Sequence, residues 1–266
     1  MKRARLIAAY ELDPATWSAV LMTGSGTAAV ESVIAGLVPE GGRLLVVENG
    51  VYGDRIAQIV KQYGIDYEVA KFEWMQAPDI DAIIARLDSG KFTNVAIIHH
   101  ETTTGRLNAI DQLSRACAER GIGLLLDAVS SFGAEAIDFD GGGIAAIAAT
   151  ANKCLHGVPG AAFVIVRRDA LAKAASRTYC ITSALRGWRS CRMSAIRCLR
   201  LRFMRTTPWS RRCASSRKKA AGARGIGGMR SWPSRFAAGW RRWGLKARCR
   251  RMNRRSCCVC IACRRA

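Results

Sequence analysis

The sequence predicts an α/β fold in which a mostly parallel sheet lies between two layers of helices. Short apolar runs alternate with segments of helical apolar spacing across residues 18–168. The runs are almost continuously apolar, which is typical of strands buried on both faces. Several polar side chains directly follow these runs, as expected where ligands bind beyond the carboxyl ends of parallel strands.

The predicted strands and helices alternate along the chain. Apolar runs predict buried strands at residues 19–22, 44–47, 95–98, 123–126, 144–149 and 162–166. Apolar residues at helical spacing predict helices at residues 27–37, 52–63, 80–87 and 109–120.

A glycine-rich turn, TGSGT at residues 23–27, follows the first predicted strand and opens the first predicted helix. Glycines let a backbone approach an anion closely, and a helix N-terminus offers N–H groups and the positive end of a dipole. Ser25, Gly26 and Thr27 are therefore candidate phosphate ligands. The alternative is a tight turn in which a Ser or Thr side chain caps the helix.

Asp127 and Lys153 each come just after an apolar run. The carboxylate of Asp127 can pair with a protonated pyridine nitrogen, or it can cap a helix or bind a metal. We expect Lys153 to be partly buried, so that a Schiff base would remove an awkward charge. An anion cradle, a carboxylate and an amine together predict a pyridoxal phosphate site with Asp127 and Lys153 as its catalytic residues and no metal.

Two further residues are candidates for contact with the cofactor ring. Tyr52 can stack on the ring, or it can pack in the core at a helix start. Thr102 can hydrogen-bond the side of the ring that carries the phenolic oxygen. His99 and His100 are adjacent on a predicted strand and so point opposite ways, which disfavours a shared metal. Cys154 is expected to pack rather than to react.

The two parts of the chain differ sharply in charge. Residues 1–178 carry 17 Lys and Arg and 20 Asp and Glu, whereas residues 179–266 carry 25 Lys and Arg and no acidic residue. The second part also holds nine of the 11 cysteines and five of the seven tryptophans. The first part shows no apolar leader, no membrane-length apolar run and no disulfide framework, so we expect a cytoplasmic protein.

We therefore expect a large domain at residues 1–178 and an aberrant basic tail at residues 179–266. A surge of Arg, Cys and Trp is typical of G+C-rich DNA translated in the wrong phase, so we interpret the tail as a shifted frame. The slip is expected between Thr178 and Arg192, because reading one base earlier from Arg192 can restore helical spacing and balanced charge. The alternatives are a genuine nucleic-acid-binding tail and a metal site at cysteines 257–263.

Five segments resemble the class V aminotransferases of pyridoxal-phosphate fold type I. They are LMTGSGTAAV (21–30), NGVYGDR (49–55), HHETTTG (99–105), DAVSSFG (127–133) and ANKCLHGVPG (151–160). The resemblance covers about residues 17–178. Within the family, the segments around Tyr52 and Lys153 are most similar to the 2-aminoethylphosphonate:pyruvate aminotransferases.

This resemblance implies a role for each candidate. The phosphate would be held by Ser25, Gly26 and Thr27. The ring would contact Tyr52, Thr102, Val129 and Asn152, while Asp127 pairs with its nitrogen and Lys153 with its aldehyde. Lys153 would also move a proton between the substrate carbon and the cofactor. The implied reaction transfers the amino group of 2-aminoethylphosphonate to pyruvate, giving phosphonoacetaldehyde and alanine, in a homodimer with active sites at the subunit interface.

Two features depart from the family pattern. About 20 residues precede the first predicted strand, where the family has a longer segment that helps to cover the site. The family's small C-terminal domain, which supplies an arginine for the substrate carboxylate, would begin near Arg177, and no residue of the tail matches that arginine. We therefore expect this chain to be poorly soluble and weakly active or inactive.

Other functions stay open at this point. An alanine:glyoxylate or serine:pyruvate aminotransferase would differ in its amino donor. A desulfurase is disfavoured because neither Cys117, within a helix, nor Cys154, beside Lys153, suits a mobile nucleophile. A nucleic-acid-binding protein would use the basic tail, and its binding would depend steeply on salt.

Overall fold

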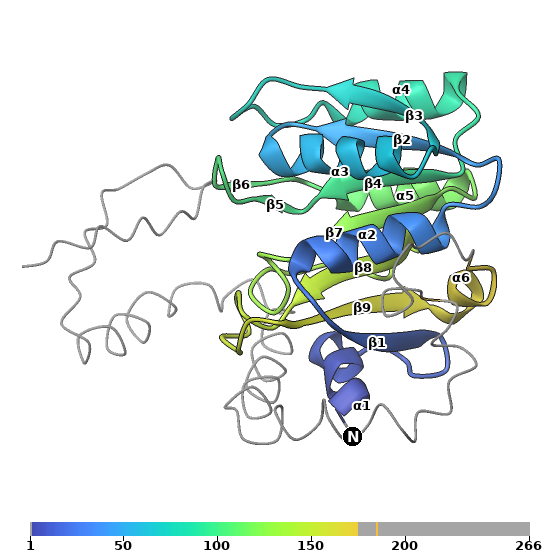
Figure 1. Cartoon of the computed structure of the whole chain (residues 1–266). Coiled ribbons are helices and arrows are strands. Elements are labelled where there is room, and N and C mark those ends of the chain that lie inside the picture. The colour runs from blue at the N-terminus through green and yellow to red at the C-terminus, as the bar shows by residue number, and fades with distance from the viewer. Residues whose placement is uncertain (1, 175–184, 186–266) are drawn as a thin grey trace, which may run out of the picture.

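A seven-stranded sheet runs through the protein, with helices packed on both of its faces (Figure 1). The computed structural model describes residues 2–174 and Leu185. The predicted basic tail, apart from Leu185, lies outside these described residues. The sheet is mostly parallel, so the predicted α/β fold class is confirmed.

The elements alternate as the sequence predicts. The helical elements of the described residues are α1 (Lys2–Ile7), the 3-10 turn η1 (Ala8–Tyr10), α2 (Gly26–Leu37), α3 (Val51–Gln62), α4 (Ile80–Ser89), α5 (Asp111–Glu119) and α6 (Arg168–Ala172). The strands are β1 (Trp17–Thr23), β2 (Arg43–Glu48), β3 (Asp66–Lys71), β4 (Asn94–Ile98), β5 (His100–Glu101), β6 (Arg106–Leu107), β7 (Gly123–Asp127), β8 (Ile144–Thr150) and β9 (Ala161–Arg167).

The strand order brings three strand ends to one edge of the sheet. The order is β1-β9-β8-β7-β4-β2-β3, and β8, β7, β4, β2 and β3 run parallel to one another. β9 is antiparallel to both β8 and β1, so β1 points the same way as β8. The carboxyl ends of β1, β7 and β8 therefore lie at the same edge, where the chemistry-bearing segments begin.

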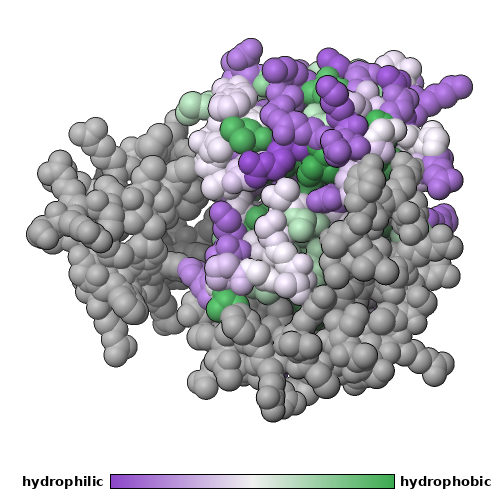
Figure 2. Space-filling model, in the orientation of Figure 1, coloured by the Kyte–Doolittle hydropathy of each residue, from purple (hydrophilic) through white to green (hydrophobic). Residues whose placement is uncertain are grey.

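Alternate side chains of the strands enter two apolar cores on opposite faces of the sheet. Leu44 and Val46 of β2 pack in the core with α2, α3 and α6, whereas Leu45 and Val47 pack in the core with α1, α4 and α5. This two-sided burial explains the almost continuous apolar runs. Hydrophilic side chains gather at the top of the view, over α3, α4 and β3 (Figure 2). No helix of the described part is long and apolar enough to cross a bilayer.

All predicted strands and helices are present, with ends within two residues of the predicted ones. The sequence pattern did not predict β3, whose sequence DYEVAK mixes charged and apolar residues. β3 lies at the edge of the sheet beside β2, so it is only partly buried and lacks an apolar run. The two-residue strands β5 and β6 form an antiparallel hairpin that is too short for a periodic signal.

Candidate functional site

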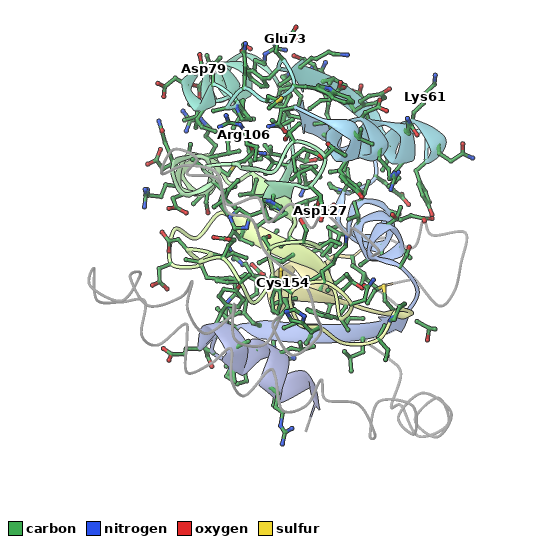
Figure 3. All side chains as sticks on the ribbon, turned by 90° about the vertical axis from the view of Figure 1, so that its left-hand side faces the viewer. Lys61, Glu73, Asp79, Arg106, Asp127 and Cys154 are labelled. Atoms are coloured by element: carbon green, nitrogen blue, oxygen red, sulfur yellow. The ribbon has the colours of Figure 1, made fainter. Side chains whose placement is uncertain are left out.

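A cavity of about 410 Å³ opens at the carboxyl edge of the sheet. Figure 3 looks onto this edge, with Asp127 and Cys154 near its middle. The turn before α2 and the first turns of α2, the first three turns of α3, the end of β7 and the loop after β8 line the cavity. The lining includes eight of the nine predicted site residues, namely Ser25, Gly26, Thr27, Tyr52, Asp127, Val129, Asn152 and Lys153.

The N-terminus of α2 forms one wall of the cavity. Ser25 is its N-cap, since the Ser25 hydroxyl oxygen accepts the Ala28 N–H at 3.2 Å. The N–H groups of Gly26 and Thr27 have no acceptor within the helix, because the first turn of a helix lacks the preceding carbonyls. Capping and anion binding, which the sequence left as alternatives, are thus compatible at this turn.

Gly26 is required by close packing rather than by its backbone angles. A Cβ atom at this position would lie 2.7 Å from both γ-carbons of Val129. Val129 lines the cavity from the segment that follows β7. The absence of a side chain at Gly26 therefore lets the predicted anion-binding turn, residues 23–27, approach the wall that carries Asp127.

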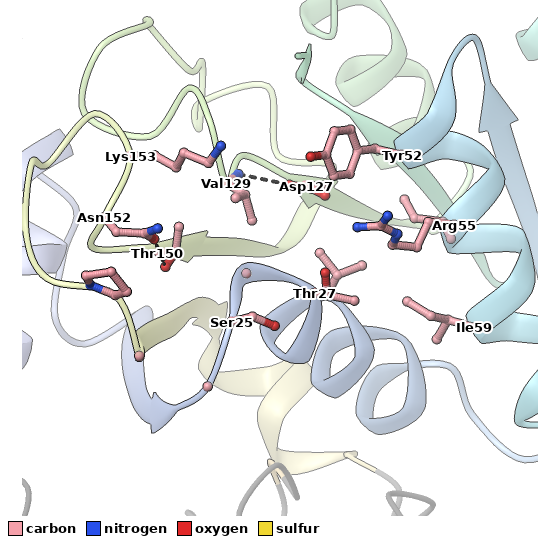
Figure 4. A pocket seen from close by; sticks show the side chains of 16 residues that line it. Ser25, Thr27, Tyr52, Arg55, Ile59, Asp127, Val129, Thr150, Asn152 and Lys153 are labelled. Atoms are coloured by element: carbon pink, nitrogen blue, oxygen red, sulfur yellow. Dashed lines mark hydrogen bonds between the residues drawn. The ribbon is translucent and has the colours of Figure 1, made fainter. Parts of the chain in front are cut away.

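Asp127 ends β7 and faces the cavity (Figure 4). Its Oδ1 accepts the Val129 N–H at 2.9 Å. The pKa of Asp127 is raised to about 6, mainly by burial and also by Glu101, against the lowering effects of the Val129 N–H, Arg55 and Lys153. A positive charge brought beside this carboxylate would favour its ionised form.

Lys153 lies in the turn after β8, and its side chain points into the cavity (Figure 4). The expectation that Lys153 is partly buried was wrong, because the side chain is exposed. The preceding Asn152 is exposed as well, so this turn lies at the protein surface and the amine is in reach of solvent. The neighbouring Asn152 lines the cavity too, and its Oδ1 lies 2.8 Å from the hydroxyl of Thr150.

Helix α3 forms the wall opposite the loop after β8. Tyr52 lies in its first turn, and the guanidinium of Arg55 sits 5.0 Å from the centre of the Tyr52 ring. Arg55 lines the cavity but was not a predicted site residue. Its sequence signal is weak, since an arginine in an amphipathic helix is usually a solvated charge. A possible signal was its place one turn after Tyr52, on the same helix face.

Thr102 is the one predicted site residue that does not line the cavity. It is exposed, in the turn between β5 and β6.

The neighbouring histidines His99 and His100 contact different serines. His99 Nδ1 lies 3.0 Å from Ser131 Oγ, and His100 Nδ1 lies 2.9 Å from Ser130 Oγ.

Burial also sets the protonation states of His99, His100 and Cys154. It lowers the pKa of His99 to about 4 and lowers that of His100, so both rings are neutral near pH 7. The Cys154 thiol donates to the Ser130 carbonyl at 2.9 Å, and burial raises its pKa. A thiol that is kept protonated in this way is a poor nucleophile.

The comparison with family models decides the classification. The model of "Aminotransferase class-V" matches residues 2–182. The chain belongs to the class V aminotransferases. Pyridoxal phosphate is the cofactor of this family, and the cavity fits it. The free N–H groups at the start of α2 suit the phosphate, Asp127 suits the ring nitrogen and Lys153 supplies an amine for the aldehyde.

Two curated relatives of this aminotransferase share one name. The chain is 45% identical over 162 residues to the 2-aminoethylphosphonate–pyruvate transaminase of Burkholderia thailandensis, and this match covers 60% of the chain and 43% of the relative. It is 38% identical over 172 residues to the enzyme of that name from Bacteroides fragilis, covering 64% of the chain and 48% of the relative. The chain thus spans less than half the length of these relatives.

Solved structures agree on the fold. The aspartate aminotransferase of Thermus thermophilus is 26% identical with a TM-score of 0.62, and the match covers 69% of this chain and 51% of that one. The alanine–glyoxylate aminotransferase of a Nostoc species is 27% identical with a TM-score of 0.59, covering 64% of this chain and 45% of that one.

Proposed function

We propose that this chain is the cofactor-binding domain of a pyridoxal-phosphate-dependent aminotransferase. Its reaction would transfer the amino group of 2-aminoethylphosphonate to pyruvate, giving phosphonoacetaldehyde and alanine. The observation that carries the proposal is one cavity that joins the N-terminus of α2, the carboxylate of Asp127 and the amine of Lys153. The shared name of the curated relatives supports the choice of amino donor.

The cofactor, bound through its aldehyde, withdraws electrons from the carbon that carries the substrate's amino group and so makes a proton on that carbon acidic. The Gly26 and Thr27 N–H groups and the Ser25 hydroxyl would bind the phosphate at the positive end of the α2 dipole. Asp127 would accept a hydrogen bond from the protonated ring nitrogen. That pairing would hold Asp127 ionised despite its buried position.

The remaining residues would orient the ring and move the proton. Tyr52 on α3 and Val129 after β7 would pack against its two faces, while Asn152 would contact its edge. We include Thr102 among the ring contacts, which requires the β5–β6 turn to approach the cavity. The amine of Lys153, once released by the incoming substrate amine, would take a proton from the substrate carbon and return it to the cofactor.

The proposal extends to the organisation of the chain. Residues 1–178 would form the large domain, and residues 179–266 would be a shifted frame that replaces the small domain. The intact protein would be a cytoplasmic homodimer. The chain with this tail would be weakly active or inactive, and its 25 basic residues would bind nucleic acid without sequence preference.

Trapping of the cofactor on one lysine tests the proposal. The full chain is mixed with pyridoxal phosphate and reduced with borohydride, and the labelled peptide is identified by mass spectrometry. We expect the label on Lys153, and we expect Lys153→Ala to abolish it. Lys91→Ala, on an exposed residue away from the cavity, is the matched control and should keep the label. Label spread evenly over the exposed lysines would contradict the proposal.

The amino donor is tested separately on a protein whose C-terminal reading frame has been restored, because the chain with the basic tail is expected to be weakly active or inactive. Conversion of the bound cofactor to its aminated form is followed by absorbance after addition of 2-aminoethylphosphonate, alanine or serine. We expect 2-aminoethylphosphonate to act fastest. A preference for alanine or serine would favour the second candidate, an alanine:glyoxylate or serine:pyruvate aminotransferase, which the similarity to the Nostoc structure supports.

A further inference from the structure

Glu101 is a fully buried carboxylate outside the lining of the cavity. It belongs to the β5–β6 hairpin, and among the ion pairs of the described residues none includes it. A buried charge is costly unless donors surround it. The structure supplies such donors from two directions, so the position of this side chain is strongly defined.

The first direction is the N-terminus of α3. Glu101 Oε2 accepts the Tyr52 N–H at 3.0 Å. The N-cap residue of α3 is Gly50, which offers no side chain for capping. The carboxylate of Glu101 therefore caps α3 from another element, and the positive end of the helix dipole compensates its charge.

The second direction is the hairpin itself. Glu101 Oε1 accepts the N–H of Thr103 at 3.2 Å and also the Thr103 hydroxyl. Both oxygens of the carboxylate are thus engaged, one with each element. A charged acceptor shared in this way ties the β5–β6 hairpin to the start of α3.

Close packing confirms how tightly the two elements meet. A Cβ atom at Gly50 would lie 2.5 Å from Glu101 Cγ and 2.6 Å from its Cδ. Beside this contact, the buried amides of Asn49 and Asn108 bond to each other, with Asn49 Nδ2 donating to Asn108 Oδ1 at 2.9 Å. The segment from Asn49 to Tyr52, after β2, is therefore joined to the β5–β6 hairpin and the residue that follows it by two polar contacts.

We propose that Glu101 is a positioning residue, whose carboxylate sets the place of Tyr52 against the cofactor ring by capping α3. The proposal rests on the proposed cofactor site. The cap acts on the residue that would stack on the ring, because the capped N–H is that of Tyr52 itself. Glu101 also directly precedes Thr102, the other predicted ring contact of this region, in the chain.

The test measures cofactor binding rather than turnover. Pyridoxal phosphate is titrated into the full chain and into Glu101→Gln, and the visible circular dichroism of the bound cofactor is recorded. We expect the variant to bind about tenfold more weakly, since glutamine replaces the two charged acceptor oxygens by one neutral acceptor and an NH2 donor, and to show a weaker dichroic band. Equal affinity and an equal band in the two proteins would overturn the proposal.

A double variant separates positioning from general stability. If Glu101 acts through Tyr52, Glu101→Gln should have no further effect on affinity in a Tyr52→Leu background. The same tenfold loss in that background would count against the proposal. Asp79→Asn is the matched control, because Asp79 caps α4 through the Ala82 N–H at 3.1 Å, and α4 lines no part of the cavity. Its cofactor affinity should be unchanged.

Amide exchange in the unaltered chain provides a measurement that needs no variant to fold. The Tyr52 N–H should exchange slowly with solvent although it lies in the first turn of a helix. Rapid exchange would exclude the cap. Failure of transamination would bear on the proposed function alone, because binding and amide exchange do not depend on turnover.

Discussion

Asp127 combines a position that faces the cavity with a carboxyl group whose pKa burial raises to about 6. In the unfolded chain this pKa is near the ordinary value of about 4. Between these two values the folded chain holds a proton that the unfolded chain has lost. The contribution of Asp127 to folding is therefore most favourable at low pH and declines as the pH rises through about 6.

This decline in the contribution of Asp127 with rising pH gives a prediction for the stability of the cofactor-free chain. Unfolding free energies measured with urea between pH 4 and pH 7 should contain a decline of up to about 3 kcal/mol that Asp127→Asn removes. The asparagine variant should thus have a flatter profile. A profile that is unchanged by the substitution would show that other groups cause the decline.

At the scale of residues, sequence position alone predicted most of the cavity. Asp127 and Lys153 were predictable because each directly follows a buried strand, and parallel strands bring such ends together. Arg55 was not, because its pattern is that of an ordinary helix surface. The exposure of Lys153 was missed, since an apolar run before a lysine says nothing about how open the following turn is. The cofactor contacts of all nine predicted site residues stay predictions, and Thr102 differs from the others only in lying outside the cavity lining.

At the scale of elements, the start of α2 depends on a residue of another segment. Gly26→Ala should place its Cβ against Val129 and separate the anion-binding turn from the wall of Asp127. We expect pyridoxal phosphate affinity to fall about tenfold or more, in line with the typical penalty of overpacking.

A second glycine provides the control for this substitution. Gly41→Ala also introduces strain, because Gly41 has φ +69°, but open space surrounds it and it lies outside the cavity lining. Its cofactor affinity should not change. Equal losses of affinity in the two variants, measured by absorbance titration, would contradict the role given to Gly26.

The elements themselves were predictable where burial was complete. β4 and β8 are buried at every residue, and their apolar runs gave their bounds within two residues. β3 failed to give a signal because an edge strand with one neighbour keeps charged residues such as Asp66 and Lys71 exposed. Periodicity reports burial, so a strand that is half exposed escapes it.

At the scale of the whole molecule, Leu185 is a described residue from beyond α6 in the chain that packs against α2. It is fully buried in the core that contains α2, and a Cβ atom at Gly36 would lie 3.1 Å from Leu185 Cδ1. Leu185→Ala should lower the free energy of unfolding by about 3 kcal/mol. Leu107→Ala, at an exposed leucine, should cost less than about 0.5 kcal/mol, and equal losses in urea unfolding would contradict this packing.

The family match bears on where the predicted frame shift would lie. The model of the family matches the chain as far as residue 182, which falls between Thr178 and Arg192. We therefore keep the expected slip between the codons of these two residues. Sequencing the coding DNA from independent material should find an added or missing base there. An uninterrupted frame would mean that the basic tail is truly encoded.

The pairing of β1 with β9 has a consequence for synthesis on the ribosome. β1 is an edge strand whose neighbour is β9, and the Gly24 N–H bonds to the Gly160 carbonyl at 3.0 Å. Nearly the whole domain must be translated before β1 can pair with β9. This translation takes roughly 10–30 s at typical elongation rates. Until then the predicted anion-binding turn follows a strand, β1, that is not yet paired in the sheet. The cofactor can therefore join the nascent chain only after β9 has left the exit tunnel.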